Sequence, residues 1–505
     1  MDNILKAFIL VFEWHTMLVV LLASIFGLIV GAIPGLTATM AMALLVPLTF
    51  FLGPIPAVGG MIACSAMAIF AGDIPGTLLR MPGTPASAAY TDEAYAMTRN
   101  GQAQQALGAN LLFSAVGGIF GTLVLIFAAP ALAEFATNFS SFEYFWMGML
   151  GLTCAVIIGA ADRTKGVISL LIGLAIATIG INNPAGMPRF TFGNMNLLSG
   201  VDFIAAMIGF FAVSEILRYT ISDRKVLVVV QQEFGNLFAS CGTLMRQYWP
   251  QQLRGNIVGT AIGALPGAGA DIAAWIAYAV SKKFSRTPEK FGTGHIEGVI
   301  ESTSANNAAL GGAWIPAMVF GIPGDTITAI VIGVLYMKGM NPGPSMFIKN
   351  PENIYAIFIL FIVANLLMLP LGWAAIKMAR KVLSVPQNLL MPLILLFCIV
   401  GAYAATNSSY GVLLMMVFGV VGFVMEARGF PVAPAILGLV LGPMLEESFV
   451  NSMISADGNL AGLVGRPVAG TLAAFCAAVW LLPLMRAVWN KFRKPVLTPV
   501  ETSGN

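Results

Sequence analysis

Charged residues are scarce in this sequence: Asp, Glu, Lys and Arg make up 10% of its 505 residues, whereas 58% of the residues are hydrophobic. A soluble protein of this length needs far more charge to cover its surface, so the shortage excludes a soluble globular protein. The net charge of +3 is small and gives no reason to expect a nucleic-acid partner. The basic residues are therefore informative by position, as markers of the cytoplasmic side of a membrane.

Histidine and cysteine are also few. Two histidines, His15 and His295, cannot supply a histidine metal cluster. The five cysteines form no C-x-x-C pair, which argues against a zinc site or a disulfide framework; they are Cys64, Cys154, Cys241, Cys398 and Cys476. We predict no cofactor, and a co-transported Na⁺ is the one bound ion that the sequence leaves open.

Apolar runs long enough to cross a lipid bilayer recur along the whole chain. They predict an all-α polytopic membrane protein with about 11 crossings plus two re-entrant hairpins. The acidic segment LEESFVNSMISADGN (445–459) is predicted to be an external loop. The predicted crossings lie at about 57–89, 105–130, 141–161, 164–181, 200–220, 295–336, 354–376, 388–405, 408–425, 430–446 and 468–486.

Helix-breaking Pro-Gly pairs recur at matched positions in the two halves of the chain. GAIPGLTATMAMAL (31–44) shares the pattern G-A-x-P-G with GALPGAGADIAAWI (263–276), 232 residues later. IPGTLLRMPGTPASA (74–88) aligns with IPAMVFGIPGDTITA (315–329) at an offset of 241 residues. Two matched elements in the same order, at nearly one offset, indicate an internal duplication.

Each G-A-x-P-G turn lies between two apolar arms, which predicts a helical hairpin. In the second copy the arms of about 252–265 and 268–281 span only ~21 Å each, short of the ~30 Å apolar core of a bilayer. Basic residues flank this hairpin, whereas the loop LGPIPAVGG after the first hairpin carries no charge. The asymmetry favours hairpins that enter from opposite sides. A re-entrant hairpin enters and leaves on the same side, so each copy crosses the membrane five times. Because five is an odd number, we predict that the two copies are inverted.

The predicted organisation has four parts. They are a first transmembrane repeat at 1–225 with its hairpin at about 17–51, a cytoplasmic connector at 226–250, a second repeat at 251–450 with its hairpin at about 252–281, and a last helix with a basic cytoplasmic tail at 451–505.

The breaks place helix N-termini and small hydroxylated residues at membrane depth. At this depth the backbone leaves helical form only where protein or water forms hydrogen bonds with its N–H and C=O groups. A half-helix that starts after Pro-Gly points its free N–H groups into the centre of the membrane. We therefore predict a binding site for an anion; the alternative is that the kinks serve packing and the hydroxyls bond to their own helix. The candidate substrate-binding residues are Gly35, Thr37, Thr39, Gly83, Thr84, Ser87, Gly267, Gly324, Thr326, Asn306 and Asn307.

Acidic residues inside apolar segments are costly and usually functional. The candidates for coupling to a cation or proton are Asp271, Asp325, Asp73 and Glu301. Asp271 and Asp325 follow a Pro-Gly pair by a few residues, so helix capping is an equally open role for them. The amides of Asn306 and Asn307 suit substrate or Na⁺ coordination, or alternatively a helix–helix contact. A Na⁺ site would combine Asp271, Asn306, Asn307 and Asp325.

Long motifs along the chain resemble those of a known family. GAIPGLTATMAMALLVPLTF, GALPGAGADIAAWIAYAVSKKFSRTPEKFGTG and EGVIESTSANNAALGGAWIPAMVFGIPGDTITAIVIG are similar to the large membrane subunit, of the TctA type, of the tripartite tricarboxylate transporters. The likeness is clear over about 17–350 and extends over the rest by hydropathy. At YTDEA (90–94) the sequence departs from the Thr-rich stretch that is usual in the family.

The resemblance implies a multi-pass subunit of a bacterial inner-membrane importer. Its partners would be a small four-helix membrane subunit and a periplasmic solute-binding protein that delivers a di- or tricarboxylate such as citrate. Uptake would be driven by a Na⁺ or H⁺ gradient without an ATPase, and the absence of the P-loop motif G-x-x-x-x-G-K-S/T agrees with this. The alternatives are a stand-alone ion-coupled organic-anion transporter and a channel. An enzyme is disfavoured, because no G-x-S-x-G motif occurs and both histidines lie near segment ends.

Overall fold

The computed structural model describes residues 2–33, 36–159, 162–181, 183–221, 237, 241–379 and 387–492. Within these residues the regular secondary structure is helical, apart from one isolated bridge between Gly180 and Arg189. This confirms the predicted all-α class.

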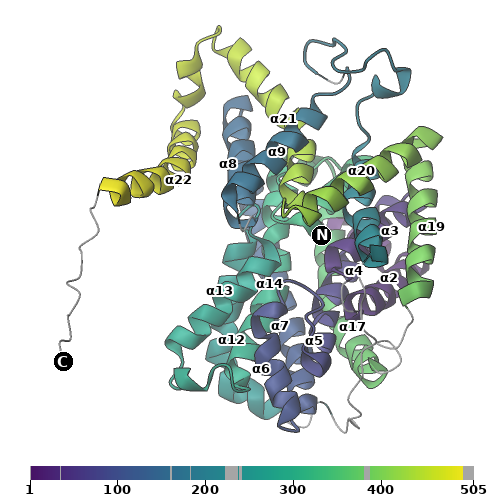
Figure 1. Cartoon of the computed structure of the whole chain (residues 1–505), viewed down its shortest axis with the longest axis vertical. Helices are drawn as coiled ribbons and strands as arrows, with labels where there is room; N and C mark the ends of the chain where they lie inside the picture. Colours follow the sequence, from purple (N-terminus) through teal and green to yellow (C-terminus); the bar gives the residue numbers. More distant parts are fainter. Residues whose placement is uncertain are drawn as a thin grey trace, which may run out of the picture.

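The helices follow one another with short connections. In the first half they are α1 (Asp2–Phe12), α2 (Trp14–Ala32), α3 (Ala38–Thr49), α4 (Pro54–Ala71), α5 (Asp73–Leu79), α6 (Ala88–Arg99), α7 (Ala103–Ala136), α8 (Ser141–Gly159), α9 (Arg163–Ala177), α10 (Phe203–Ile208) and α11 (Ser214–Ile221). In the second half they are α12 (Cys241–Gly263), α13 (Gly269–Phe284), α14 (Ile296–Phe320), α15 (Thr326–Met337), α16 (Pro344–Lys349), α17 (Pro351–Lys377), α19 (Gln387–Thr406), α20 (Ser409–Ala427), α21 (Val432–Ser455) and α22 (Pro467–Phe492). Figure 1 shows α2 and α3 on one side of the molecule, α12 and α13 on the other, and α22 extending away from the main body.

Seven helices among the described residues are long and apolar enough to cross a membrane. By length and composition they are Trp14–Ala32, Pro54–Leu79, Ala103–Ala136, Phe203–Ile221, Pro351–Lys377, Ser409–Ala427 and Val432–Ser455. Six of them coincide with predicted crossings, and Trp14–Ala32 coincides with the first arm of the predicted hairpin. The chain is therefore a multi-pass membrane protein, while the full number of crossings and the re-entrant character of the hairpins stay predictions.

Two helices, α4 and α14, form the centre of the molecule. All residues from Ile55 to Ala71 in α4 and from Glu297 to Phe320 in α14 are buried. Helix α14 is unusual for such a position because it carries a polar run, ESTSANN (301–307). Polar groups at membrane depth need protein partners, so the surrounding helices must supply them.

Glycines let the neighbouring helices approach α4 and α14 closely. Gly31 of α2 faces the backbone of Ala68 in α4, and Gly263 of α12 faces the backbone of Ala309 in α14, each without room for a Cβ atom. Small residues at such contacts are a common packing solution in membranes. The two contacts correspond under the offsets of 232 and 241 residues, and one turn earlier the pairs Gly27–Cys64 and Gly259–Ala305 repeat the correspondence.

The Pro-Gly breaks after α5 and α14 are also built alike. The helices end at residues in the left-handed conformation, Arg80 (φ 59°) and Gly321 (φ 67°), which lie 241 residues apart. In the next turn, a Cβ atom at Gly83 would lie 2.8 Å from the Gly31 carbonyl oxygen, and one at Gly324 would lie 2.9 Å from the Gly263 carbonyl oxygen. Both predicted broken helices are therefore broken, and glycine is required at each break by close backbone contact.

Two predicted boundaries differ from the helix bounds in the structure. The segment 445–459 is helical as far as Ser455, so the prediction of a loop was wrong there, whereas its external side stays a prediction. The predicted boundary at residue 450 falls inside α21. Residues 241–250 of the predicted connector begin α12, which has a non-helical residue at Tyr248 beside Pro250. Most of the connector, Gly35 and the tail beyond residue 492 lie outside the described residues.

Candidate functional site

The first-copy breaks are each followed by hydroxyl groups that bond to nearby backbone N–H groups. The Thr37 hydroxyl accepts a hydrogen bond from the Met40 N–H (3.2 Å) at the start of α3. The Ser87 N–H donates to the Thr84 hydroxyl (3.1 Å), and the Thr84 N–H donates to the Ser87 hydroxyl (3.1 Å), just ahead of α6. Thr37 therefore caps its own helix start, which is the alternative role that the sequence left open for it, whereas Thr84 and Ser87 bond to each other in the turn before α6.

The matching break in the second copy has the same pair of reciprocal hydrogen bonds, with the carboxylate of Asp325 in place of a hydroxyl. The Asp325 side chain accepts a hydrogen bond from the Thr328 N–H (2.7 Å), and the Asp325 N–H donates to the Thr328 hydroxyl (2.9 Å), which forms a capping box at α15. Asp325 and Thr328 lie 241 residues after Thr84 and Ser87. The helix dipole favours the negative charge at this position.

The second hairpin turns between α12 and α13 and is tied to the first copy. Positive φ angles at Gly267 (82°) and Gly269 (57°) reverse the chain, and a Cβ atom at Gly269 would lie 2.5 Å from the Asp325 Cβ. Asp271, in the first turn of α13, accepts a hydrogen bond from the Ala86 N–H (3.2 Å). The two breaks and the second hairpin therefore converge on one region.

This region encloses a cavity of about 190 Å³. The hydroxyl oxygens of Thr39 on α3 and Thr326 on α15 lie 3.0 Å apart at its wall, although 287 residues separate them in the chain. Seven of the candidate residues from the sequence line the cavity: Thr37, Thr39, Thr84, Asp271, Asn306, Asp325 and Thr326. The structure thus brings together residues from both copies that the sequence showed only as separate breaks.

The cavity wall also holds three charged residues that the sequence analysis did not assign to a site. They are Glu215 and Arg218 of α11 and Glu426 of α20. Arg218 is bonded to Glu215, and its guanidinium lies 3.5 Å from the Glu426 carboxylate. A charge pair at i and i+3 inside the apolar crossing 200–220 was the available signal, because charges at membrane depth usually mark function.

The other candidate residues do not line the cavity. They are Gly83, Ser87, Gly267, Gly324, Asn307, Asp73 and Glu301. Buried Asp73 accepts hydrogen bonds from the hydroxyls of Tyr90 (2.5 Å) and Thr303 (2.9 Å), and the Asn306 amide donates to the same Tyr90 oxygen (3.2 Å). Asp73 is therefore linked to the cavity wall through Tyr90 and Asn306.

Glu301 has a partner of its own away from the cavity. The Arg254 guanidinium donates to both of its carboxylate oxygens, at 2.6 and 2.5 Å. A bidentate pair of this kind satisfies a buried carboxylate and orients the two helices that carry it. Its predicted coupling role stays a prediction, and the geometry favours Asp271 and Asp325 over it because both lie at the cavity.

A metal site of the usual kind is not found in the described part of the chain, where no three His, Cys, Asp or Glu side chains gather to hold an ion. Of the predicted Na⁺ ligands, Asp271, Asn306 and Asp325 line the cavity, whereas Asn307 does not. Both amide atoms of buried Asn307 lack a hydrogen-bond partner. Binding of Na⁺ stays a prediction.

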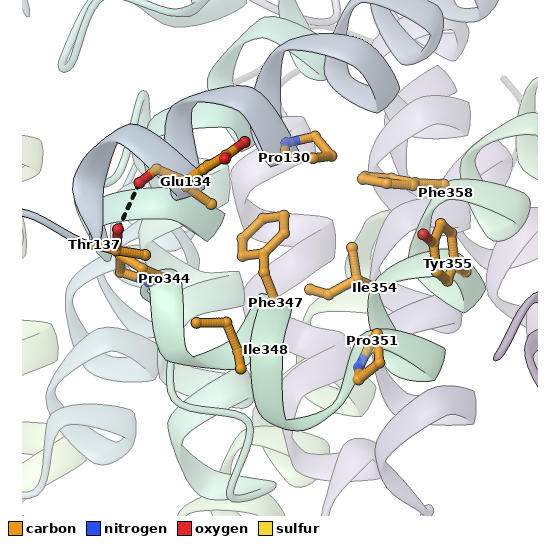
Figure 2. Close-up of a pocket in the computed structure, with 11 residues that line it drawn as sticks. Pro130, Glu134, Thr137, Pro344, Phe347, Ile348, Pro351, Ile354, Tyr355 and Phe358 are labelled. Carbon is orange, nitrogen blue, oxygen red and sulfur yellow. Dashed lines mark hydrogen bonds between the residues drawn. The ribbon is translucent and has the colours of Figure 1, made fainter.

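A second pocket, of about 220 Å³, lies between α7, α16 and α17 and contrasts with the first. Figure 2 shows Phe347, Ile354 and Phe358 around it, with Glu134 of α7 at one edge. Its lining is mainly apolar, and its one charged residue is acidic. None of the candidate residues lines it, and it offers an anion no basic side chain, so the cavity between the breaks is the better candidate site.

Comparison with known proteins agrees with the resemblance noted in the sequence. The family described as "Tripartite tricarboxylate transporter TctA family" matches residues 17–437. The chain is 35% identical over 470 residues to the "Uncharacterized 52.8 kDa protein in TAR-I ttuC' 3'region" of Agrobacterium vitis, which covers 92% of this chain and 93% of that protein. It is 35% identical over 232 residues to the "Uncharacterized protein in TAR-II ttuC' 3'region" of the same organism, over 45% of this chain and 96% of that protein. No solved structure matches the chain significantly.

Proposed function

We propose that this chain, which belongs to the tripartite tricarboxylate transporter TctA family, is the translocating subunit of a secondary transporter that imports a di- or tricarboxylate. Because the members of this family are transporters, we assign this chain a role in transport rather than in catalysis. The observation that carries the proposal is the cavity in which the broken helices of both copies meet.

The chemistry of this cavity suits a small carboxylate. Helices α3 and α15 begin at its wall, and their N-termini present backbone N–H groups and the positive ends of the helix dipoles. Thr39 and Thr326 add hydroxyls that can donate to a carboxylate oxygen. The volume of about 190 Å³ is below the ~300–1,000 Å³ typical of pockets for drug-sized ligands, in keeping with a small substrate.

Coupling to a cation follows from the charges at the wall. Four carboxylates and one guanidinium line the cavity: Asp271, Asp325, Glu215, Glu426 and Arg218. An anionic substrate would be repelled unless positive charge entered with it. We propose co-transport of Na⁺ or H⁺, with Asp271 and Asp325 as the coupling carboxylates.

The proposal includes an inverted arrangement of the two copies. Its support is the glycine contacts and the reciprocal hydrogen bonds that recur at matched positions of the two halves, together with the charge asymmetry of the two hairpins. Inverted repeats whose broken helices meet near the midplane are a recurring plan for alternating access.

The family name suggests partners for this chain. A tripartite system implies a small membrane subunit, for which we propose four helices, and a periplasmic solute-binding protein that delivers the carboxylate. We place the assembly in the inner membrane of a bacterium. The binding protein would make most of the substrate selection.

The test is uptake by cells that express this chain together with the small membrane protein and the binding protein encoded beside it. We expect saturable uptake of radiolabelled citrate, or of succinate or malate in the same panel, that needs all three proteins and collapses when the Na⁺ and H⁺ gradients are dissipated. Uptake without the binding protein would favour a stand-alone transporter, and unsaturable flux would favour a channel. No uptake of any carboxylate in the panel would contradict the proposal.

A further inference from the structure

Arg218 and Glu426 are brought together by a close contact between α11 and α20. A Cβ atom at Gly422 of α20 would lie 3.1 Å from the Ser214 Cβ of α11, so the two backbones nearly touch. Arg218 follows Ser214 by one turn, and Glu426 follows Gly422 by one turn, so the next contact along both helices is this charge pair. A π-helical segment, Gly209–Val213, leads into α11, and such segments frequently occur at functional sites.

Two of the carboxylates that contact Arg218 hold it unequally. Glu215, whose side chain is 9% exposed, is directly bonded to the guanidinium. The Glu426 carboxylate lies 3.5 Å away, beyond hydrogen-bond distance, and its side chain is 31% exposed. The Arg218 side chain is 45% exposed, at the cavity wall. Glu215 therefore positions Arg218, whereas Glu426 makes a loose ion pair that an incoming carboxylate can replace.

Arg218 is the only basic residue among those described at the cavity wall. A guanidinium presents a planar fork of N–H donors that matches a carboxylate with two parallel hydrogen bonds. Substrate carboxylates would therefore find their strongest partner here, since every other charged group at the wall is acidic. We propose that Arg218 binds a carboxylate of the transported substrate, and that Glu426 occupies Arg218 while substrate is absent; this assignment rests on the proposed function.

An exchange of this kind predicts opposite effects for the two residues. Removal of Arg218 takes away a charge-assisted contact to the substrate, so its affinity falls. Removal of the Glu426 charge takes away the group that competes with the substrate for Arg218, so its affinity rises. A purely structural ion pair would instead make both substitutions harmful in the same direction.

The experiment measures the half-saturation constant for radiolabelled citrate uptake, in cells that express the chain with its small membrane subunit and binding protein. We expect Arg218→Gln to raise the constant about 10- to 100-fold, the loss expected for one charge-assisted hydrogen-bonded contact. Glu426→Gln should lower it. Arg428→Gln is the matched control, because Arg428 is an exposed basic residue near the same helix end that does not line the cavity, and it should change nothing.

The outcomes separate this inference from the proposed function. If the parent takes up citrate and Arg218→Gln behaves like Arg428→Gln, the role of Arg218 is wrong while the transport function stands. An unchanged or raised constant for Glu426→Gln would overturn the exchange.

A chemical measurement covers the case in which Arg218→Gln fails to reach the membrane. Phenylglyoxal, which modifies arginine, is applied to the purified parent complex with and without citrate, and the Arg218 peptide is followed by mass spectrometry. We expect citrate to slow modification of Arg218 and to leave Arg428 unaffected. Equal modification of Arg218 with and without citrate would overturn the proposal.

Discussion

At the scale of single residues, the structure divides the candidates between helix capping and the cavity. Thr84 and Ser87 bond to each other in the turn before α6, and Asp325 caps α15, while both Thr84 and Asp325 also line the cavity. Asp271 bonds to the first copy rather than to its own helix. The sequence predicted which residue types gather at the breaks, but the choice between these roles depends on contacts between helices far apart in the chain.

Asp271 and Asp325 should differ from an ordinary surface carboxylate in their effect on coupling. Replacement of either by Asn keeps the shape and most of the capping ability but removes the charge. We expect Asp271→Asn or Asp325→Asn to abolish accumulation or to change its dependence on the ion. The measurement is uptake into proteoliposomes with binding protein supplied, under Na⁺ and pH gradients imposed separately.

The control for this prediction is Asp92→Asn, since Asp92 forms an exposed ion pair with Arg80 that contributes little. It should keep the ion dependence of the parent. If both cavity variants also keep that dependence, neither carboxylate couples transport to the gradient, and Asp73 with its link to Asn306 becomes the next candidate.

Arg218 and Glu426 show what the sequence could not reveal at this scale. Arg218 lies near the end of the predicted crossing 200–220 and Glu426 just after the crossing 408–425, where charges ordinarily mark the membrane boundary. Their meeting depends on the close packing of α11 on α20 at Gly422, a contact between segments some 200 residues apart. No local pattern carries this information.

At the scale of elements, the breaks were predictable and the helix ends were not. Pro-Gly pairs mark the turns after α5, α12 and α14, because their backbone requirements are local. The acidic segment 445–459 looked like a loop, yet α21 continues through it to Ser455. At the start of this segment Arg189 donates to both carboxylate oxygens of Glu446, at 2.8 Å each, a long-range contact that local sequence does not reveal.

The two hairpins should open toward opposite sides of the membrane. Single cysteines at Gly53, after the first hairpin, and at Lys282, near the end of the second, occupy exposed positions. In a background without the five native cysteines, a membrane-impermeant maleimide should label the cysteine at 53 from the periplasm and the cysteine at 282 only in inverted vesicles. Labelling of both from one side would contradict the inverted arrangement.

At the scale of the whole molecule, the proposed duplication accounts for two sets of breaks that line one cavity. In the first half, Gly31 packs α2 against α4, and the later turn at Gly83 packs on Gly31. In the second half, Gly263 packs α12 against α14, and the turn at Gly324 packs on Gly263. The sequence revealed the duplication through its spacing. The cavity itself could not be predicted in detail, because contacts such as Thr39 to Thr326 join segments 287 residues apart.

We propose that the cavity between the two copies binds the transported carboxylate. The most direct measurement is the rate at which N-ethylmaleimide labels single cysteines at Thr39 and Thr326 in the cysteine-free background, with and without citrate. We expect citrate to slow labelling at both positions, one from each copy, and to leave an exposed single cysteine at Gly53 unaffected. Equal rates with and without citrate at both cavity positions, in a protein that still takes up citrate, would contradict the proposal.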